Sequence, residues 1–220
     1  MGSRTSTEAE QRLTAAEAKL KLHLIPAQVS FDYFNPYFLS DYIPEHDFYG
    51  LLQAYDLPMQ TSKEIPGISA MYEALRVTRH RYKLKLSLVF FVIHSNATPE
   101  IKAELLYLTY VRGEEASVEV IQKLVNNLVD ISLNVSKRLL PGDTEVIEYI
   151  SKLKTVRTVL FSTLKDQLSF PVTLPNFLIV LTSPQFVPLL APSSLRQSLL
   201  SLYTKHSPSS FSAVRMPLIY

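Results

Sequence analysis

The sequence predicts an α+β fold, in which helices cover a small sheet built around a strand at 83–94. The stretch Leu84–His94 (LKLSLVFFVIH) is the most hydrophobic continuous run, and Leu84, Leu86 and Leu88 alternate with polar residues at the period of a strand. The range 115–168 repeats apolar residues at three- and four-residue spacing, which predicts a long antiparallel helical hairpin. An all-α bundle is the alternative, if the central stretch is instead a buried helix.

Composition limits the class of protein. The chain has 220 residues, a net charge of +2 and no Cys, which excludes disulfides, thiolate metal sites and a Cys nucleophile. Only 19% of residues are charged and 47% are hydrophobic, so we expect either a large core or a surface that is covered by another molecule. No secretion signal or membrane-spanning run is apparent, and we expect an intracellular, cytoplasmic protein without a cofactor or a metal.

The first 25 residues are expected to form an exposed helix that precedes one α+β domain at 26–220. Residues 5–22 are rich in Ala, Glu and Lys, with Leu13, Ala16 and Leu20 at helical spacing. The first six residues match the N-myristoylation pattern, which would place a lipid on Gly2. A single myristoyl chain gives only weak membrane anchoring.

Aromatic residues are concentrated in the segment 26–60, which Pro36 and Pro44 interrupt. We expect this segment to be mostly irregular, after a short strand at Val29–Tyr33, and to pack on a surface rather than form its own core. That surface is either the same domain or a partner protein, since Tyr and Phe are frequent anchors of interfaces. The candidate partner-binding residues are Phe31, Tyr33, Phe34, Tyr37, Phe38, Tyr42, Phe48 and Tyr49.

The remaining elements follow from local signals. We expect helices at 68–80, at 99–112 after a Thr98 cap, and at 195–205. A Pro141-Gly142-Asp143 turn joins the two helices of the hairpin, whose second face also carries apolar residues. A second short buried strand is expected at 177–182, and an edge strand within the apolar tail at 214–220.

A cluster of basic residues with one tyrosine precedes the central stretch. Cations and an aromatic ring together suit a nucleic-acid backbone and its bases, and this is the alternative binding function. The near-neutral total charge instead favours an ordinary solvated strand face and helix end. The residues concerned are Arg76, Arg79, Arg81, Lys83 and Lys85, with His80 and Tyr82 among them.

Two further groups of residues are candidates for metal binding or catalysis. Asp41, Glu45, His46 and Asp47 group carboxylates with a histidine, but without the spacing of a zinc motif, so a solvated loop is favoured. His94 ends the central stretch, where ligands bind in open sheets, and a polar pocket around it would indicate a small enzyme of unrecognised type.

The sequence therefore favours a non-enzymatic interaction subunit or structural scaffold component of a larger protein assembly. Its expected docking elements are the aromatic segment and the helical hairpin, and its expected partners are other protein subunits or further copies of itself. The basic cluster and His94 define the two alternatives, a nucleic-acid-binding module and an enzyme.

Overall fold

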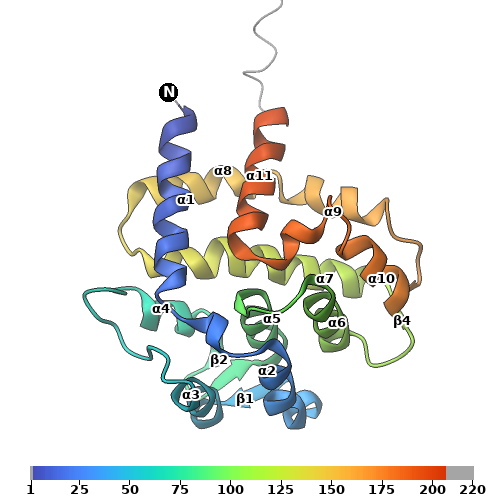
Figure 1. The fold of residues 1–220 in the computed structure, drawn as a ribbon, viewed down its shortest axis with the longest axis horizontal. Coiled ribbons are helices and arrows are strands. Elements are labelled where there is room, and N and C mark those ends of the chain that lie inside the picture. Colours follow the sequence, from blue (N-terminus) through green and yellow to red (C-terminus); the bar gives the residue numbers. More distant parts are fainter. Residues whose placement is uncertain (1, 207–220) are drawn as a thin grey trace, which may run out of the picture.

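In the computed structural model, which describes residues 2–206, helices surround a central buried helix and carry a small sheet at one end (Figure 1). The α-helices are α1 (Gly2–Ala18), α2 (Ala27–Phe34), α3 (Glu45–Ala54), α4 (Ile68–Glu73), α5 (Leu84–His94), α6 (Pro99–Tyr110), α7 (Val118–Asp130), α8 (Thr144–Lys154), α9 (Arg157–Lys165), α10 (Leu174–Leu181) and α11 (Pro192–His206). Shorter turns are the 3₁₀ helices η1 (Leu22–Leu24), η2 (Asn35–Leu39), η4 (Ser136–Leu139) and η5 (Val187–Leu190), and the π-helix η3 (Ile131–Val135). The mostly helical α+β class is confirmed.

The expected central strand is wrong, because Leu84–His94 forms helix α5. Its side chains from Leu86 to Ile93 are all buried, so apolar residues occupy every face of the helix. A short apolar run of this kind has the same pattern in a buried strand and in a buried helix. The alternation of the first leucines therefore carried no information about the element that forms.

The three-stranded sheet lies just before α5 in the chain. Its strands are β1 (Tyr42–Pro44), β2 (Arg76–Thr78) and β3 (Arg81–Lys83), in the antiparallel order β1-β3-β2. A second, minimal ladder pairs β4 (Glu115–Ala116) with β5 (Val172–Thr173). The strand expected at 177–182 is wrong, since that run belongs to helix α10, and the helix expected at 68–80 ends early at Glu73.

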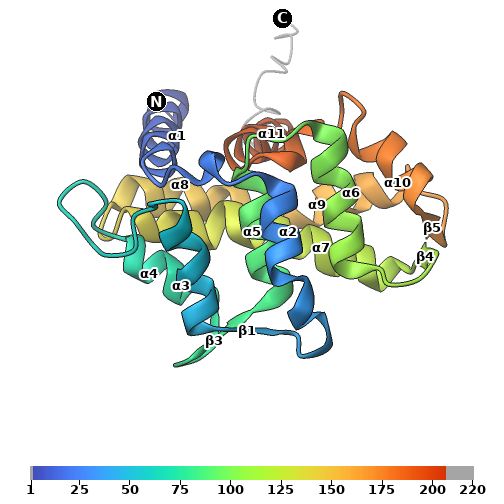
Figure 2. The ribbon, with the colours of Figure 1, turned by 60° about the horizontal axis from the view of Figure 1, so that its bottom comes forward.

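The helical hairpin forms, with its second arm divided into α8 and α9, and most of its apolar residues are covered within the chain. The Asp143 carboxylate caps α8 by accepting a hydrogen bond from the Val146 amide at 3.1 Å. Val125, Val129 and Leu133, which lie outside the main apolar stripe, are buried, whereas Val159 and Phe161 are half-buried. Figure 2 shows α5 and α6 lying against one side of the hairpin.

Helix α1 is packed rather than exposed, which corrects the expectation for the first 25 residues. Ala9, Leu13 and Ala16 form one buried stripe of α1, which buried Leu20 continues just after the helix ends, and α1 contacts α8 and α11. These residues join the same hydrophobic core as α5. Gly2 is the first residue of α1, and its lipidation stays a prediction, while the tail at 214–220 lies outside the described residues.

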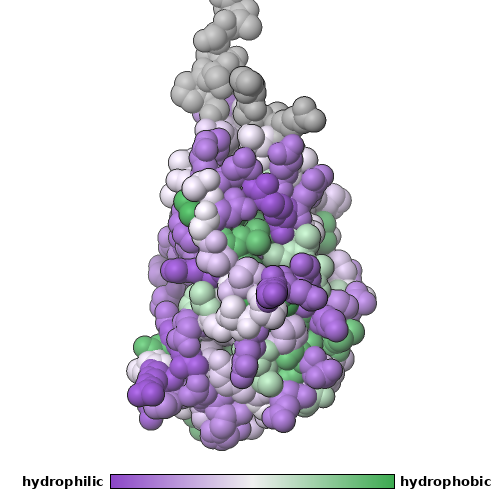
Figure 3. All heavy atoms as spheres, turned by 90° about the vertical axis from the view of Figure 1, so that its left-hand side faces the viewer, coloured by the Kyte–Doolittle hydropathy of each residue, from purple (hydrophilic) through white to green (hydrophobic). Residues whose placement is uncertain are grey.

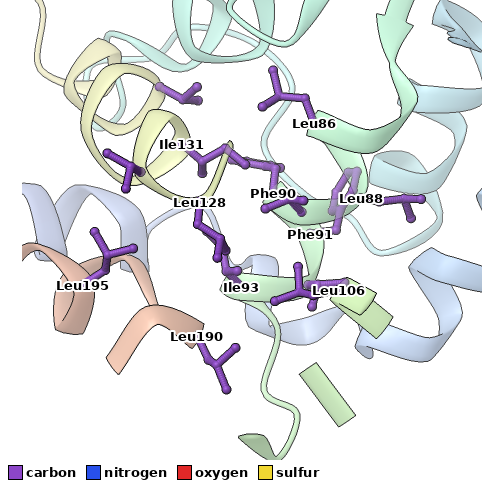
Figure 4. Packing of buried hydrophobic residues seen from close by; sticks show 14 of the residues in the cluster. Leu86, Leu88, Phe90, Phe91, Ile93, Leu106, Leu128, Ile131, Leu190 and Leu195 are labelled. Carbon is purple, nitrogen blue, oxygen red and sulfur yellow. The ribbon is translucent and has the colours of Figure 1, made fainter. Parts of the chain in front are cut away.

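Aliphatic and aromatic side chains from distant parts of the chain meet around α5. Figure 4 shows Phe90 and Ile93 of α5 beside Leu128 and Ile131 of the hairpin. The end of the molecule on the left of Figure 1 is mostly hydrophilic, with apolar residues only in small scattered patches (Figure 3). None of the described helices has the length and apolarity needed to cross a membrane.

Candidate functional site

The aromatic segment is not mostly irregular but folds into α2, η2, β1 and α3. The strand expected at Val29–Tyr33 is wrong, because this run lies within helix α2. The aromatic rings of the segment divide between core and surface. The predicted anchors Phe34 and Phe48 are fully buried, and each packs on Phe91 of α5, with ring centroids 5.7 and 5.6 Å away. Phe48 also stacks on Tyr82 at 3.8 Å. Phe34 and Phe48 are therefore core residues and not surface anchors, because helical periodicity turns them toward α5.

The other predicted aromatic residues reach the surface. Tyr33 and Tyr42 are 40% and 39% exposed, and four more are half-buried. Tyr37 donates a hydrogen bond to Asp47, which raises the pKa of the tyrosine to about 12 and holds it neutral. The half-buried aromatic residues are Phe31, Tyr37, Phe38 and Tyr49.

Two hollows lie on either side of η2. The first, of about 580 Å³, is lined by Tyr37, Ser40, Tyr42, Pro44, His80 and Arg81. The second, of about 410 Å³, lies between η2 and α6 and is lined by Phe31, Asn35, Phe38, Leu108, Val111, Arg112 and Gly113. Leu39, the last residue of η2, is 93% exposed. An exposed apolar residue thus ends a short helix that borders two partly aromatic hollows.

The structure brings the predicted basic cluster next to the aromatic segment. Strand β1 pairs with β3, which places Tyr42 opposite Lys83 and Pro44 opposite Arg81. The guanidinium of Arg112 lies over the Phe38 ring at 5.2 Å, beside the second hollow. We call Phe31, Tyr37, Phe38, Leu39 and Tyr42, together with Arg81 and Arg112, the aromatic–basic surface.

Members of the basic cluster have different roles. Arg76 is held at the sheet by ion pairs to Glu45 and Glu73 and by its position over the Tyr82 ring, so it is structural. Lys85 lies over the Tyr110 ring at 5.6 Å. Arg79, Arg81 and Lys83 are exposed, and among the described residues Arg81 and Arg112 have no ion-pair partner.

The acidic group at 41–47 does not converge on one point. Glu45 pairs with Arg76 and His80, whereas Asp47 accepts from Tyr37 and lies 3.2 Å from His46 Nε2. Over residues 2–206 no three or more histidine and carboxylate side chains are grouped as metal ligands. Glu45 and Asp47 therefore already have partners within the protein, whereas Asp41 is exposed next to Tyr42.

His94 lines an open pocket of about 260 Å³ whose surface is more apolar than polar, whereas the enzymatic alternative called for a deep polar pocket. Its Nδ1 donates a hydrogen bond to the Phe90 carbonyl oxygen at 2.7 Å, which leaves Nε2 as the second ring nitrogen. Burial lowers the pKa of His94, so the ring is neutral near pH 7. Glu17 and Lys102 lie in the same wall, but no side chain is arranged as a nucleophile beside the ring.

Behind this pocket lies a buried ion cluster that sequence reasoning missed. Arg196 of α11 is fully buried and binds both Glu10 and Glu17 of α1 with hydrogen bonds of 2.7–2.9 Å. Arg196 also donates to the Ser132 carbonyl of the π-helix, while Tyr149 donates to Glu10. The only sign of this ion cluster in the sequence was a pair of glutamates, seven residues apart, next to the apolar stripe of α1.

Comparison of the chain with protein-family models, with curated proteins and with solved structures finds no match. The fold class and the geometry of these sites are therefore the basis of any functional assignment.

Proposed function

We propose that this protein is a non-enzymatic subunit that docks a partner protein on its aromatic–basic surface. The observation that carries the proposal is the 93% exposure of Leu39 at the end of η2, a short helix whose residues Tyr37 and Phe38 each line a different partly aromatic hollow. Exposed apolar clusters with a polar rim are typical of interaction sites. The hairpin, most of whose apolar residues are buried, is not part of this docking surface.

The expected occupant is an acidic, amphipathic segment of another protein. Its apolar side chains would fill the two hollows that η2 borders, because those hollows are lined by Phe31, Phe38 and Tyr42. Its carboxylates would pair with Arg81 and Arg112, which have no ion pair among the described residues. Arginine and aromatic side chains together are frequent hot spots of such interfaces.

The test is affinity purification of the full chain from its native source, with Leu39→Glu compared with Ile147→Glu. Ile147 of α8 is 49% exposed and lies outside the aromatic–basic surface, so it gives a matched control. We expect one stoichiometric partner that Leu39→Glu loses and Ile147→Glu keeps. Cross-linking should then place an acidic, apolar segment of that partner at Arg81 or Arg112.

A peptide of the cross-linked segment gives the quantitative measurement. Its affinity should fall about tenfold or more in Leu39→Glu, because a carboxylate would replace an apolar contact at the centre of the surface. Capture that does not differ between the two variants, or cross-links confined to other faces, would overturn the proposal.

One observation favours single-stranded nucleic acid as a second candidate ligand. Tyr42 and Lys83 are directly opposite each other on β1 and β3, and Arg81 is two residues away. Bases stack on exposed rings while cations follow the phosphates. Salt-sensitive binding of a short oligouridine that is lost in the double variant Arg79→Ser, Arg81→Ser would support this candidate in place of the protein partner.

A further inference from the structure

A pocket forms where the carboxyl end of α5 meets α1, η1, α6 and the start of α11. Its volume of about 260 Å³ has room for several non-hydrogen atoms, since one water occupies about 30 Å³ of liquid. The side chains of Glu17, His94 and Lys102 line its polar part, and Leu22 and Ile93 line its apolar part. It is remote from the aromatic–basic surface, with which it shares no lining residue.

Lys102 is a buried cation without a counter-charge. Its side chain donates to the carbonyl oxygens of Ile93 and Leu190, both at 3.2 Å, which satisfies two of its three protons. The residue is only 8% exposed, and no carboxylate of the described residues lies within ion-pairing distance of its ammonium group. Burial lowers the pKa of Lys102 to about 8. Buried charges in proteins are normally paired, so this position lacks an anion.

His94 supplies a second group for an anion. Its Nδ1 is bound to Phe90, so Nε2 accepts a hydrogen bond when the ring is neutral and donates one when it is protonated. The charged groups that face His94 are Glu17, Arg196 and Lys102. Glu17 favours protonation of the ring, while the two cations oppose it.

The Glu17 carboxylate does not serve as the missing partner. Both of its oxygens accept hydrogen bonds from Arg196, at 2.7 and 2.9 Å, and the Ser136 hydroxyl donates to it as well. Glu10, Glu17 and Arg196 together carry one net negative charge, but neither carboxylate lies within ion-pairing distance of the Lys102 ammonium group. An arriving monoanion would therefore be accompanied most favourably by one proton, taken up by His94.

From this geometry we propose that the pocket beside His94 binds a small anion, a carboxylate or a phosphate, through the Lys102 ammonium and protonated His94. The site is independent of the proposed docking function. No chemical step is assigned to it, because no side chain is arranged as a nucleophile there.

The probes are sodium acetate and sodium phosphate, titrated into the full chain by calorimetry at constant ionic strength. We expect saturable binding of at least one probe, tighter near pH 5.5 than near pH 7, because binding is coupled to protonation of His94 while Lys102 stays mostly protonated over this range. The probe that binds more tightly distinguishes a carboxylate ligand from a phosphate ligand. The absence of saturable binding for both probes at both pH values would overturn the proposal.

Two variants assign the binding to these residues. Lys102→Met should weaken binding about tenfold or more through the loss of a charge-assisted hydrogen bond, whereas Lys63→Met, in an exposed loop, should bind as the wild type does. His94→Gln should bind with little pH dependence. If Lys102→Met does not fold, the measurement on His94→Gln tests the proposal by itself. Probe binding in His94→Gln with the same pH dependence as in the wild type would contradict the proposal.

Discussion

Two arginines of this protein bind glutamates in similar ways but in different surroundings. Arg196 has a side chain that is 0% exposed, and its partners Glu10 and Glu17 are 10% and 9% exposed. Arg76 is 14% exposed, and its partners Glu45 and Glu73 are 31% and 57% exposed. Water can replace a lost partner only at the second cluster, so the first should matter far more to stability.

The largest effect is expected for Arg196→Met. This change leaves two buried carboxylates without their cation, which should lower the free energy of unfolding by about 3–5 kcal/mol. Urea unfolding of the variant and of the wild type measures the difference. Arg112→Met, at an exposed arginine, is the control and should be nearly neutral.

A triple variant separates the loss of the cation from the loss of packing. Replacing Glu10, Glu17 and Arg196 together by Leu, Met and Leu removes every charge of the cluster, and most of the lost stability should return. A triple variant as unstable as Arg196→Met would mean that the shape of the cluster, rather than its charge balance, stabilises the contact between α1 and α11.

Acid should weaken the buried cluster in two steps. Burial opposes ionisation of Glu17, but Arg196 outweighs it, so the folded-state pKa lies below the ordinary value of 4.5. The stability due to Glu17 is therefore present above pH 4.5 and is lost as the pH falls below it. For His94, burial itself lowers the pKa, because it disfavours the charged ring. The stability due to neutral His94 is therefore lost as the pH falls below 6.5.

Urea unfolding across this pH range, with His94→Gln and Arg196→Met, assigns the two steps. His94→Gln should lack the upper step. In Arg196→Met, burial acts on Glu17 without the opposing cation and raises the pKa of this carboxyl group, so this variant should gain stability relative to the wild type as the pH falls toward 4.5. Parallel pH curves for Arg196→Met and the wild type would contradict this assignment.

The smallest effect is expected for Arg76→Met. Its ion pairs are partly exposed, so the free energy of unfolding should fall by about 1 kcal/mol, and added salt should reduce the difference. The position of Arg76 over Tyr82, at 5.0 Å, adds a contact that salt screens less. A cost as large as that of Arg196→Met would show that exposure does not distinguish the two clusters.

Local signals in the sequence predicted local structure well. Thr98-Pro99 marks the start of α6, where the Thr98 hydroxyl accepts from the Ile101 amide, and Pro141-Gly142-Asp143 marks the turn of the hairpin. These signals succeed because the residues that make a cap or a turn are neighbours in the chain.

Long-range structure was not predictable in the same way. Periodicity did not distinguish a helix from a strand at Leu84–His94, because burial on every side removes the polar face that reports the period. Composition correctly singled out the aromatic segment, but only the packing on α5 separates Phe34 and Phe48 from the surface rings. The partners of Arg196 are 179 and 186 residues away, a distance at which the sequence offers no spacing to recognise.

That separation also affects how the chain is made. On the ribosome, α1 emerges before α11, and its two glutamates remain without their arginine until α11 has been synthesised. A nascent chain that stops before Arg196 would carry a helix whose apolar stripe and carboxylates lack part of their packing surface. The contact between α1 and α11 therefore closes only after all the elements between them have been synthesised.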